Sequence, residues 1–421
     1  MFHLRYLHTF LLLQVGFLLI NPRPSVAQAI KLDLETAVKL ALEKNLELKA
    51  KREELGIAEG RLIKSNLFLQ QNPELEGELE KFKITRGEPE FGRNHTNYGF
   101  SLSQEFEVGG QSTHRREAAQ RNLDKVKFEI SDSERTLRFR IAEIFLKLLS
   151  TQAKVKQGEL IVDLRARLYE ASKTRLSLGD IPAIQLVVPE LELNRAKSEL
   201  IASQREYEEL LFRLKTELAV EKDEAIELIG DLTRPPFSAP LDGLLKGAVE
   251  RRPDLIAFER EKKISEAEEL LTRAERIPNI KLGAFYNREK QDGAYILGGR
   301  ISIPIPIWDR KQAELREALA RKSIANLNYI NRRQALGREI QAAFAKFRLA
   351  ERDLSLYPEG TLKKLDESLD LYQRAYQERA IDLADTILFQ NQVIEARLKF
   401  LDALTNYNLS LAELKFHAGI E

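Results

Sequence analysis

Regularly spaced carboxylates are the side chains of this sequence best suited to act on a ligand. Four of them occupy alternate positions of one short segment: Glu74, Glu76, Glu78 and Glu80. Two more stand three residues apart near the other end of the chain: Asp382 and Asp385. Rings of carboxylates select cations in a pore without making or breaking a bond. The same patterns are typical of the wet face of an antiparallel sheet and of solvated helix surfaces, so the spacing alone leaves both interpretations open.

The residues that enzymes and metalloproteins need are absent or scattered. The sequence has no cysteine, which excludes thiolate chemistry. The later histidines, His95, His114 and His417, are too widely separated to predict a metal site, and no nucleophile motif, P-loop or dinucleotide fingerprint occurs. The 66 basic and 65 acidic residues leave no basic excess for nucleic acid. We therefore predict a non-enzymatic protein with no cofactor, no bound metal and no nucleic-acid partner.

The N-terminus is typical of a secretory signal peptide. Arg5 precedes an apolar run at residues 10–20, and Ala27-Gln28-Ala29 offers small residues for cleavage. We predict a signal peptide over residues 1–29. No later apolar stretch is long enough for a transmembrane helix. The mature protein is then either soluble beyond the inner membrane or crosses a membrane as β-structure.

Two segments predict β-hairpins because their residues alternate between apolar and polar. In the first, Leu75 and Leu79 alternate with the glutamates, and residues 97–103 return with the same period. In the second, residues 280–287 and 295–307 alternate around a turn at residues 291–293. Pro304 and Pro306 cannot donate ladder hydrogen bonds, so this last strand must leave the sheet near them.

Very long helices are predicted to follow each hairpin. Residues 111–178 contain no proline, and their apolar residues recur at spacings of three and four. Such a helix is roughly 100 Å long at 1.5 Å per residue. Similar stripes occupy the second half of the chain: Leu336, Ile340, Phe344 and Phe347, then Ile387, Ile394, Leu398, Leu401, Leu404 and Leu411.

The order of these elements repeats once. Residues 34–48 are echoed by residues 241–255, residues 72–75 by 277–280, residues 100–103 by 301–304, and residues 175–181 by 375–381. A period near half the chain predicts two copies of one unit. We divide the mature chain into a first repeat at residues 30–230, a linker at 231–240 with three prolines, and a second repeat at 241–421.

Four strands with one apolar face cannot close a barrel by themselves. Their open edges would invite aggregation, so several copies of the chain are expected to pool their strands. Two copies supply eight strands and three supply twelve, and only the larger barrel leaves a wide lumen. In such a barrel the four glutamates line the lumen and the leucines between them face lipid.

The chain as a whole resembles the outer-membrane efflux proteins, the TolC-like channels. The resemblance rests on the order of elements, on Asn72-Pro73-Glu74-Leu75 and Arg252-Pro253-Asp254-Leu255, and on the proline-rich exit at residues 301–309. It implies a mainly α fold with a small β part: a homotrimer with a twelve-stranded transmembrane barrel and a coiled-coil α-helical barrel across the periplasm. The family further implies a periplasmic adaptor protein and, through it, an inner-membrane pump. The heavy-metal efflux channels are the subgroup most similar to it.

The helical tips are the parts for which the resemblance implies adaptor contact. The first tip is Leu178, Gly179, Asp180 and Ile181, where Gly179 suits a tight turn between helices. At the second tip Arg379 and Ala380 stand in the matching place, and the glycine is missing. We therefore expect the two tips to differ in how they bind an adaptor. A plain helix C-cap is the alternative reading of the first tip.

The resemblance also gives a role to residues near the tips and near the membrane. In the family an inward acid constricts the periplasmic mouth, and Asp382 and Asp385 follow the second tip closely on one predicted helix face. Symmetry would make them a ring. Trp308, the only tryptophan, follows the last strand, where it is either an interfacial aromatic residue in contact with outer-membrane lipid or part of the strand-to-helix packing.

The sequence thus predicts the exit duct of a tripartite efflux system, located in the outer membrane and reaching into the periplasm. Small solutes, metal cations or drugs, are the expected cargo. Two other functions remain compatible with the residues. One is a channel of the same family for type I protein secretion, and the other is a structural coiled-coil protein of the periplasm.

Overall fold

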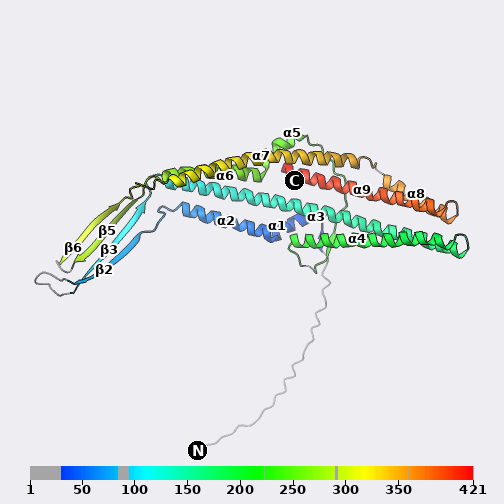
Figure 1. The fold of residues 1–421 in the computed structure, drawn as a ribbon, viewed down its shortest axis with the longest axis horizontal. Coiled ribbons are helices and arrows are strands. Elements are labelled where there is room, and N and C mark those ends of the chain that lie inside the picture. Colours follow the sequence, from blue (N-terminus) through cyan, green and yellow to red (C-terminus); the bar gives the residue numbers. More distant parts are fainter. Residues whose placement is uncertain (1–29, 84–93, 222, 290–292, 359, 421) are drawn as a thin grey trace, which may run out of the picture.

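The computed structural model describes residues 30–83, 94–221, 223–289, 293–358 and 360–420. The chain is long and narrow, with a sheet at one end and two helical hairpins that reach the other end (Figure 1). The predicted signal peptide at residues 1–29, the first hairpin loop and most of the turn at residues 291–293 lie outside the described residues.

Both predicted hairpins are confirmed, and together they form one antiparallel sheet. Its strands are β2 (Glu74–Lys83), β3 (Asn94–Phe106), β5 (Ile280–Glu289) and β6 (Ala294–Ser302), in the spatial order β2-β3-β5-β6. Strand β6 ends at Ser302, two residues before Pro304, as expected for a residue that cannot donate to a ladder.

The helices occur in the same order in both halves of the chain. The first half has α1 (Leu34–Lys44), α2 (Leu46–Ser65), α3 (Gln111–Ser177), the short 3₁₀ helix η1 (Ala183–Leu186) and α4 (Val187–Glu217). The second half has α5 (Leu241–Arg251), α6 (Pro253–Ala274), α7 (Gln312–Leu354), α8 (Thr361–Gln377) and α9 (Leu383–Ala418). The 67-residue helix α3 confirms the long helix predicted from the apolar stripe. Among the described residues, no helix is both long enough and apolar enough to cross a membrane.

The second copy of the long helix is interrupted, which the apolar stripe did not reveal. Helix α7 ends at Leu354, and α8 begins at Thr361. Pro358 lacks the backbone N–H that an uninterrupted helix would need, and Gly360 has φ +83°, a conformation that ends helical geometry. The counterpart of α3 is therefore built from two helices.

Two apolar clusters hold the middle of the molecule together. One joins α3 to α1 and the end of α4, around Ile141, Leu148 and Leu214, which are fully buried. The other joins α7, α9 and α5, around Ile340 and Leu414. The short strands β1 (Ile30–Leu32) and β4 (Ile226–Leu228) pair in parallel, which ties the start of the first repeat to its end, just before the linker.

The Arg252-Pro253-Asp254-Leu255 motif is explained by a buried ion network. Pro253 opens α6, where its missing N–H costs no hydrogen bond. Arg252 is only 1% exposed; its guanidinium donates to both carboxylate oxygens of Asp254, at 2.8 and 2.7 Å, and to the backbone carbonyl of His417, at 3.1 Å. Arg332 bridges Asp254 to Glu339, with N···O distances of 2.7 and 2.6 Å. The network fastens the end of α9 to α6 and α7.

Candidate functional site

The two helical tips have the same backbone geometry although their sequences differ. In the first, Gly179 has φ +76° and the N–H of Asp180 donates to the Arg175 carbonyl. In the second, Arg379 has φ +63° and the N–H of Ala380 donates to the Ala375 carbonyl. Both are the turn that ends a helix with one left-handed residue. The predicted correspondence between residues 175–181 and 375–381 is confirmed. The left-handed position is a glycine in the first copy and Arg379, which is strained there, in the second.

An ion pair joins the two tips. Asp180 Oδ2 and Arg379 Nη2 lie 2.6 Å apart, and the Asp180 side chain is 25% exposed. Beneath this pair, Tyr376 is 1% exposed, and its hydroxyl lies 3.1 Å from the Ser172 hydroxyl. Ile181 is also buried, whereas Leu178 is 64% exposed. The tips are therefore linked to each other within one protomer, while Leu178 is left at the surface.

The predicted acids at the start of α9 have different local roles. Asp382 is the N-cap residue in an extended conformation, and its carboxylate accepts a hydrogen bond from the Asp385 N–H at 2.8 Å. The expectation that both acids share a helical face is therefore wrong for Asp382, because this residue precedes the helix. Asp385 is exposed in the first turn of α9. Its carboxylate forms no ion pair among the described residues.

A buried arginine that the sequence did not single out links the helical hairpin of α3 and α4 to the hairpin of α8 and α9. Arg165 of α3 is 3% exposed and donates to Gln390 Oε1 of α9 at 2.6 Å and to Asn391 Oδ1. Glu192 of α4 lies 3.4 Å away. Burial lowers the pKa of the Arg165 guanidinium, against the charge of Glu192, which raises it. Buried positions of α3 follow a seven-residue spacing, at Leu137, Ile144, Thr151, Arg165 and Ser172, with the half-buried Gly158 between Thr151 and Arg165. This spacing was the signal in the sequence.

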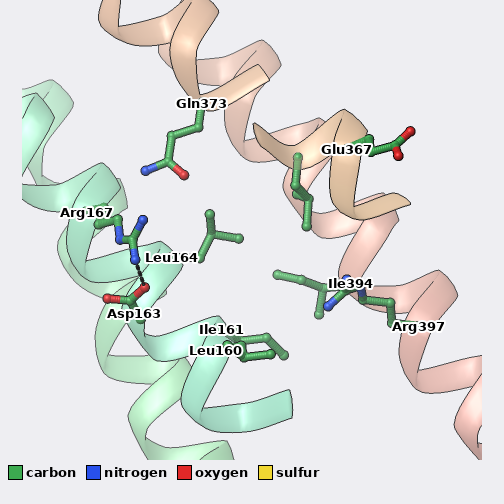
Figure 2. Close-up of a pocket in the computed structure, with 10 residues that line it drawn as sticks. Leu160, Ile161, Asp163, Leu164, Arg167, Glu367, Gln373, Ile394 and Arg397 are labelled. Atoms are coloured by element: carbon green, nitrogen blue, oxygen red, sulfur yellow. Dashed lines mark ion pairs between the residues drawn. The ribbon is translucent and has the colours of Figure 1, made fainter. Parts of the chain in front are cut away.

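Next to this arginine a cavity of about 410 Å³ opens between α3 and the helices α8 and α9. Figure 2 shows Leu160 and Leu164 of α3 facing Ile394 of α9 across it, with charged side chains around them. Arg167 and Asp163, on one face of α3, form an ion pair at 2.5 Å. The groove between the hairpins is thus apolar inside and charged at its margin.

The four predicted glutamates lie on one face of the sheet. Residues that are paired across a ladder point to the same side, and the register opposes Glu76 to Ser101 and Ser103 to Gly283. Six acids share this polar face: Glu74, Glu76, Glu78, Glu80, Glu105 and Glu289. Two cations accompany them: Lys281, which pairs with Glu74, and Arg300. Among the described side chains of this face, acids therefore outnumber cations.

The opposite face of the sheet is apolar and uncovered within the protomer. Leu75, Leu102 and Leu297 lie on it, and Leu297 is 82% exposed. Trp308 follows this sheet and is 85% exposed, so packing within the junction does not hold it. A large apolar surface of this kind marks contact with a lipid phase or another protein.

Comparison with known proteins agrees with this geometry. A model of the outer membrane efflux protein family matches residues 244–419. The cobalt-zinc-cadmium resistance protein CzcC of Cupriavidus metallidurans is 24% identical over 375 residues, which are 89% of this chain and 86% of that protein. The pyoverdine export outer membrane protein OpmQ of Pseudomonas putida is 20% identical over 84% of this chain and 83% of its own length.

Solved structures share the fold along nearly the whole chain. CusC superposes with a TM-score of 0.75 at 17% identity, covering 94% of this chain and 96% of CusC. The open state of the Neisseria gonorrhoeae MtrE outer membrane channel also gives 0.75 at 17% identity, covering 92% and 89%.

A four-stranded sheet at one end of long helices is the fold that this chain shares with CusC and with the MtrE outer membrane channel. Residues 244–419 match the outer membrane efflux protein family, and the resemblance of the whole chain to TolC-like channels is confirmed. It is a TolC-like efflux channel protein of the outer membrane that reaches into the periplasm, and its fold is that of channels rather than of enzymes.

Proposed function

We propose that three copies of this chain form the exit duct of a tripartite system that exports metal cations. The observation that carries the proposal is the two-faced sheet. Its apolar face is uncovered, and the outer edges of β2 and β6 pair with no other described strand of the protomer. Exposed edges and an exposed apolar face are both removed when copies join β6 to β2 and the ring faces lipid. Three copies would supply twelve strands.

The helical tips are proposed to dock a periplasmic adaptor. Leu178 is exposed at the end of the first hairpin, and the adjacent groove between α3 and the helices α8 and α9 has an apolar floor with charged margins. Such a groove suits the apolar stripe of a partner helix. Arg379 and Asp180 already bind each other, so this pair is expected to hold the tips together rather than to recruit the adaptor directly. An inner-membrane pump would be reached through that adaptor.

Asp385 is the acid proposed to line the periplasmic mouth. It is exposed beside the second tip, and threefold symmetry would place its copies around one axis. A carboxylate ring there would favour cations and restrict the opening. Asp382, which caps α9, would instead fix the position of this first turn.

Metal cations are proposed as cargo for two reasons. The sheet face assigned to the lumen is acidic, and cation selectivity follows from such a lining. The similarity to a cobalt-zinc-cadmium resistance protein also extends over 89% of this chain. Export of a siderophore is the second candidate, favoured by the similarity to pyoverdine export proteins. A purely structural coiled-coil role would leave the exposed apolar face of the sheet unexplained.

Single-channel recording tests the duct, and cell growth tests the cargo. We expect the purified full-length protein to migrate as a trimer in detergent and to conduct ions in a planar bilayer. A soluble monomer without conductance would refute the channel. Deleting the gene should then lower tolerance to cobalt, zinc or cadmium in the medium. Unchanged tolerance together with lost siderophore export would move the assignment to the second candidate.

A further inference from the structure

Three tyrosines surround an arginine on the apolar face of the sheet. The ladder opposes Arg288 to Tyr98 on β3 and to Tyr295 on β6, so all three side chains point to the same side. The Arg288 guanidinium donates to the Tyr98 hydroxyl at 3.0 Å and lies 5.0 Å from the Tyr295 ring centre. The Tyr286 and Tyr295 ring centres are 6.3 Å apart. The cation is thereby held in place by aromatic rings.

Within the part of the chain that the structure describes, this arginine has no acidic partner, and a second cation shares its face. Among the described residues, no carboxylate forms an ion pair with Arg288 or with Lys81. Lys81 lies on β2 opposite Thr96, on the same side as Leu79 and Tyr98, and is exposed. Two strand spacings separate β2 from β5, which is about 10 Å. Both positive charges can therefore approach one anionic group of moderate size.

The position of Arg288 along the strand is the second observation. Arg288 stands eight residues beyond Ile280, where β5 leaves the helical end of the molecule. Eight residues span roughly 27 Å along a strand, or about 20 Å of height at the usual tilt of transmembrane strands. Leu282, Leu102 and Leu297 lie between these levels on the same face. The tyrosines and Arg288 therefore follow the apolar band at its far end.

We propose that Arg288, Lys81 and the surrounding tyrosines bind the phosphate group of a phosphorylated glycolipid in the outer leaflet. The inference rests on the proposed barrel, in which the apolar face meets lipid and the strand end far from the helices faces outward. A cation is costly in the apolar band and cheap at its margin, where tyrosines are also enriched. An arginine there that lacks an acid satisfies its donors with phosphate oxygens.

A membrane lipid is a better occupant of this surface than a soluble anion. The site is continuous with the exposed leucines of the apolar face, which would contact the acyl chains of the same molecule. Its charge is positive, while the opposite face of the same sheet is mainly acidic. An anionic headgroup with apolar tails matches both features at once, whereas inorganic phosphate matches only the first.

Native mass spectrometry of the full-length trimer in detergent tests the site, with diphosphoryl lipid A as the probe. We expect the wild-type trimer to retain up to three lipid molecules. Arg288→Gln should weaken retention about tenfold, as expected when one charge-assisted contact is lost. Arg300→Gln is the matched control, because Arg300 also lies near an aromatic ring, 5.4 Å from the Phe285 centre, but on the acidic face. Its lipid retention should equal that of the wild type.

Two further measurements decide whether the bound phosphate group belongs to a lipid or is free inorganic phosphate. Dephosphorylated lipid should be retained weakly by every variant, and millimolar inorganic phosphate should not displace the lipid. Displacement by inorganic phosphate, or equal retention by wild type and Arg288→Gln, would overturn the lipid site. If Arg288→Gln does not assemble, Lys81→Gln replaces it, since the Lys81 side chain is exposed and forms no ion pair with a described residue. If the Arg288→Gln trimer conducts and retains lipid as the wild type does, only the lipid site is refuted. If the wild type does not conduct, the proposed channel is refuted.

Discussion

The ion pair between the two tips offers a direct test of what holds the two helical hairpins of one protomer together. Asp180 and Arg379 are 2.6 Å apart, but their side chains are 25% and 58% exposed. Pairs this exposed contribute about 0.2–1 kcal/mol. We expect Asp180→Asn to remove about 0.5 kcal/mol per protomer, or about 1.5 kcal/mol from a ring of three that opens together. That corresponds to a shift of roughly tenfold toward the open mouth.

Arg379 allows the ion pair to be separated from backbone strain. At φ +63° a residue with a side chain is strained by about 1 kcal/mol relative to glycine. Arg379→Gly therefore loses the pair but relieves the strain, so the tip should remain as stable while the mouth opens. Arg379→Ala loses the pair without that relief, and should both open the mouth and destabilise the tip.

Single-channel recording in a planar bilayer measures the open fraction directly. The effect of Asp180→Asn should shrink at 1 M salt, because exposed charges are screened there. Asp163→Asn is the control: its pair with Arg167 is also an exposed aspartate–arginine pair, but it lies within α3 and joins no tips. An open fraction in Asp180→Asn equal to that of the wild type would refute the reasoning. So would a double-mutant cycle with Arg379→Gln that gives no coupling.

Three further outcomes follow from the buried network and the acidic face. Asp254→Asn should destabilise the protein by about 3 kcal/mol, because it leaves the buried guanidinium of Arg252 without its main counter-charge; chemical unfolding followed by circular dichroism measures this. Acid should lower the thermal midpoint in two ranges. Burial lowers the pKa of His417, so stability is lost as pH falls through about 6.5, where the unfolded chain gains a proton first. Hydrogen bonds from arginine lower the pKa of Glu339, so its contribution is lost below about 4.5; a midpoint that is flat from pH 7.5 to 4 contradicts both. Glu78→Gln should reduce the cation preference measured from reversal potentials, and an unchanged potential would remove Glu78 from the lumen.

Local periodicity along the sequence determines most of the architecture. Alternation set the strands and the face that carries Glu74 to Glu80, and the three- and four-residue spacing set α3 to within one residue of its end. The same spacing also predicted the coiled-coil character of the long helices. These features follow from the sequence because side-chain direction in a helix or strand depends only on position along the element.

Contacts between distant segments were decided by the tertiary structure alone. Arg288 and Tyr98 are 190 residues apart and meet only because β3 and β5 become neighbours. From the sequence, Arg165 is indistinguishable from the other charged residues of its helix. In the structure the packing of α9 buries it. Likewise, Arg379 takes a left-handed conformation and finds Asp180 because both hairpins end at the same level. The sequence pattern determines which face of its own helix or strand a residue occupies. Only the folded structure determines which residues of other elements that face contacts.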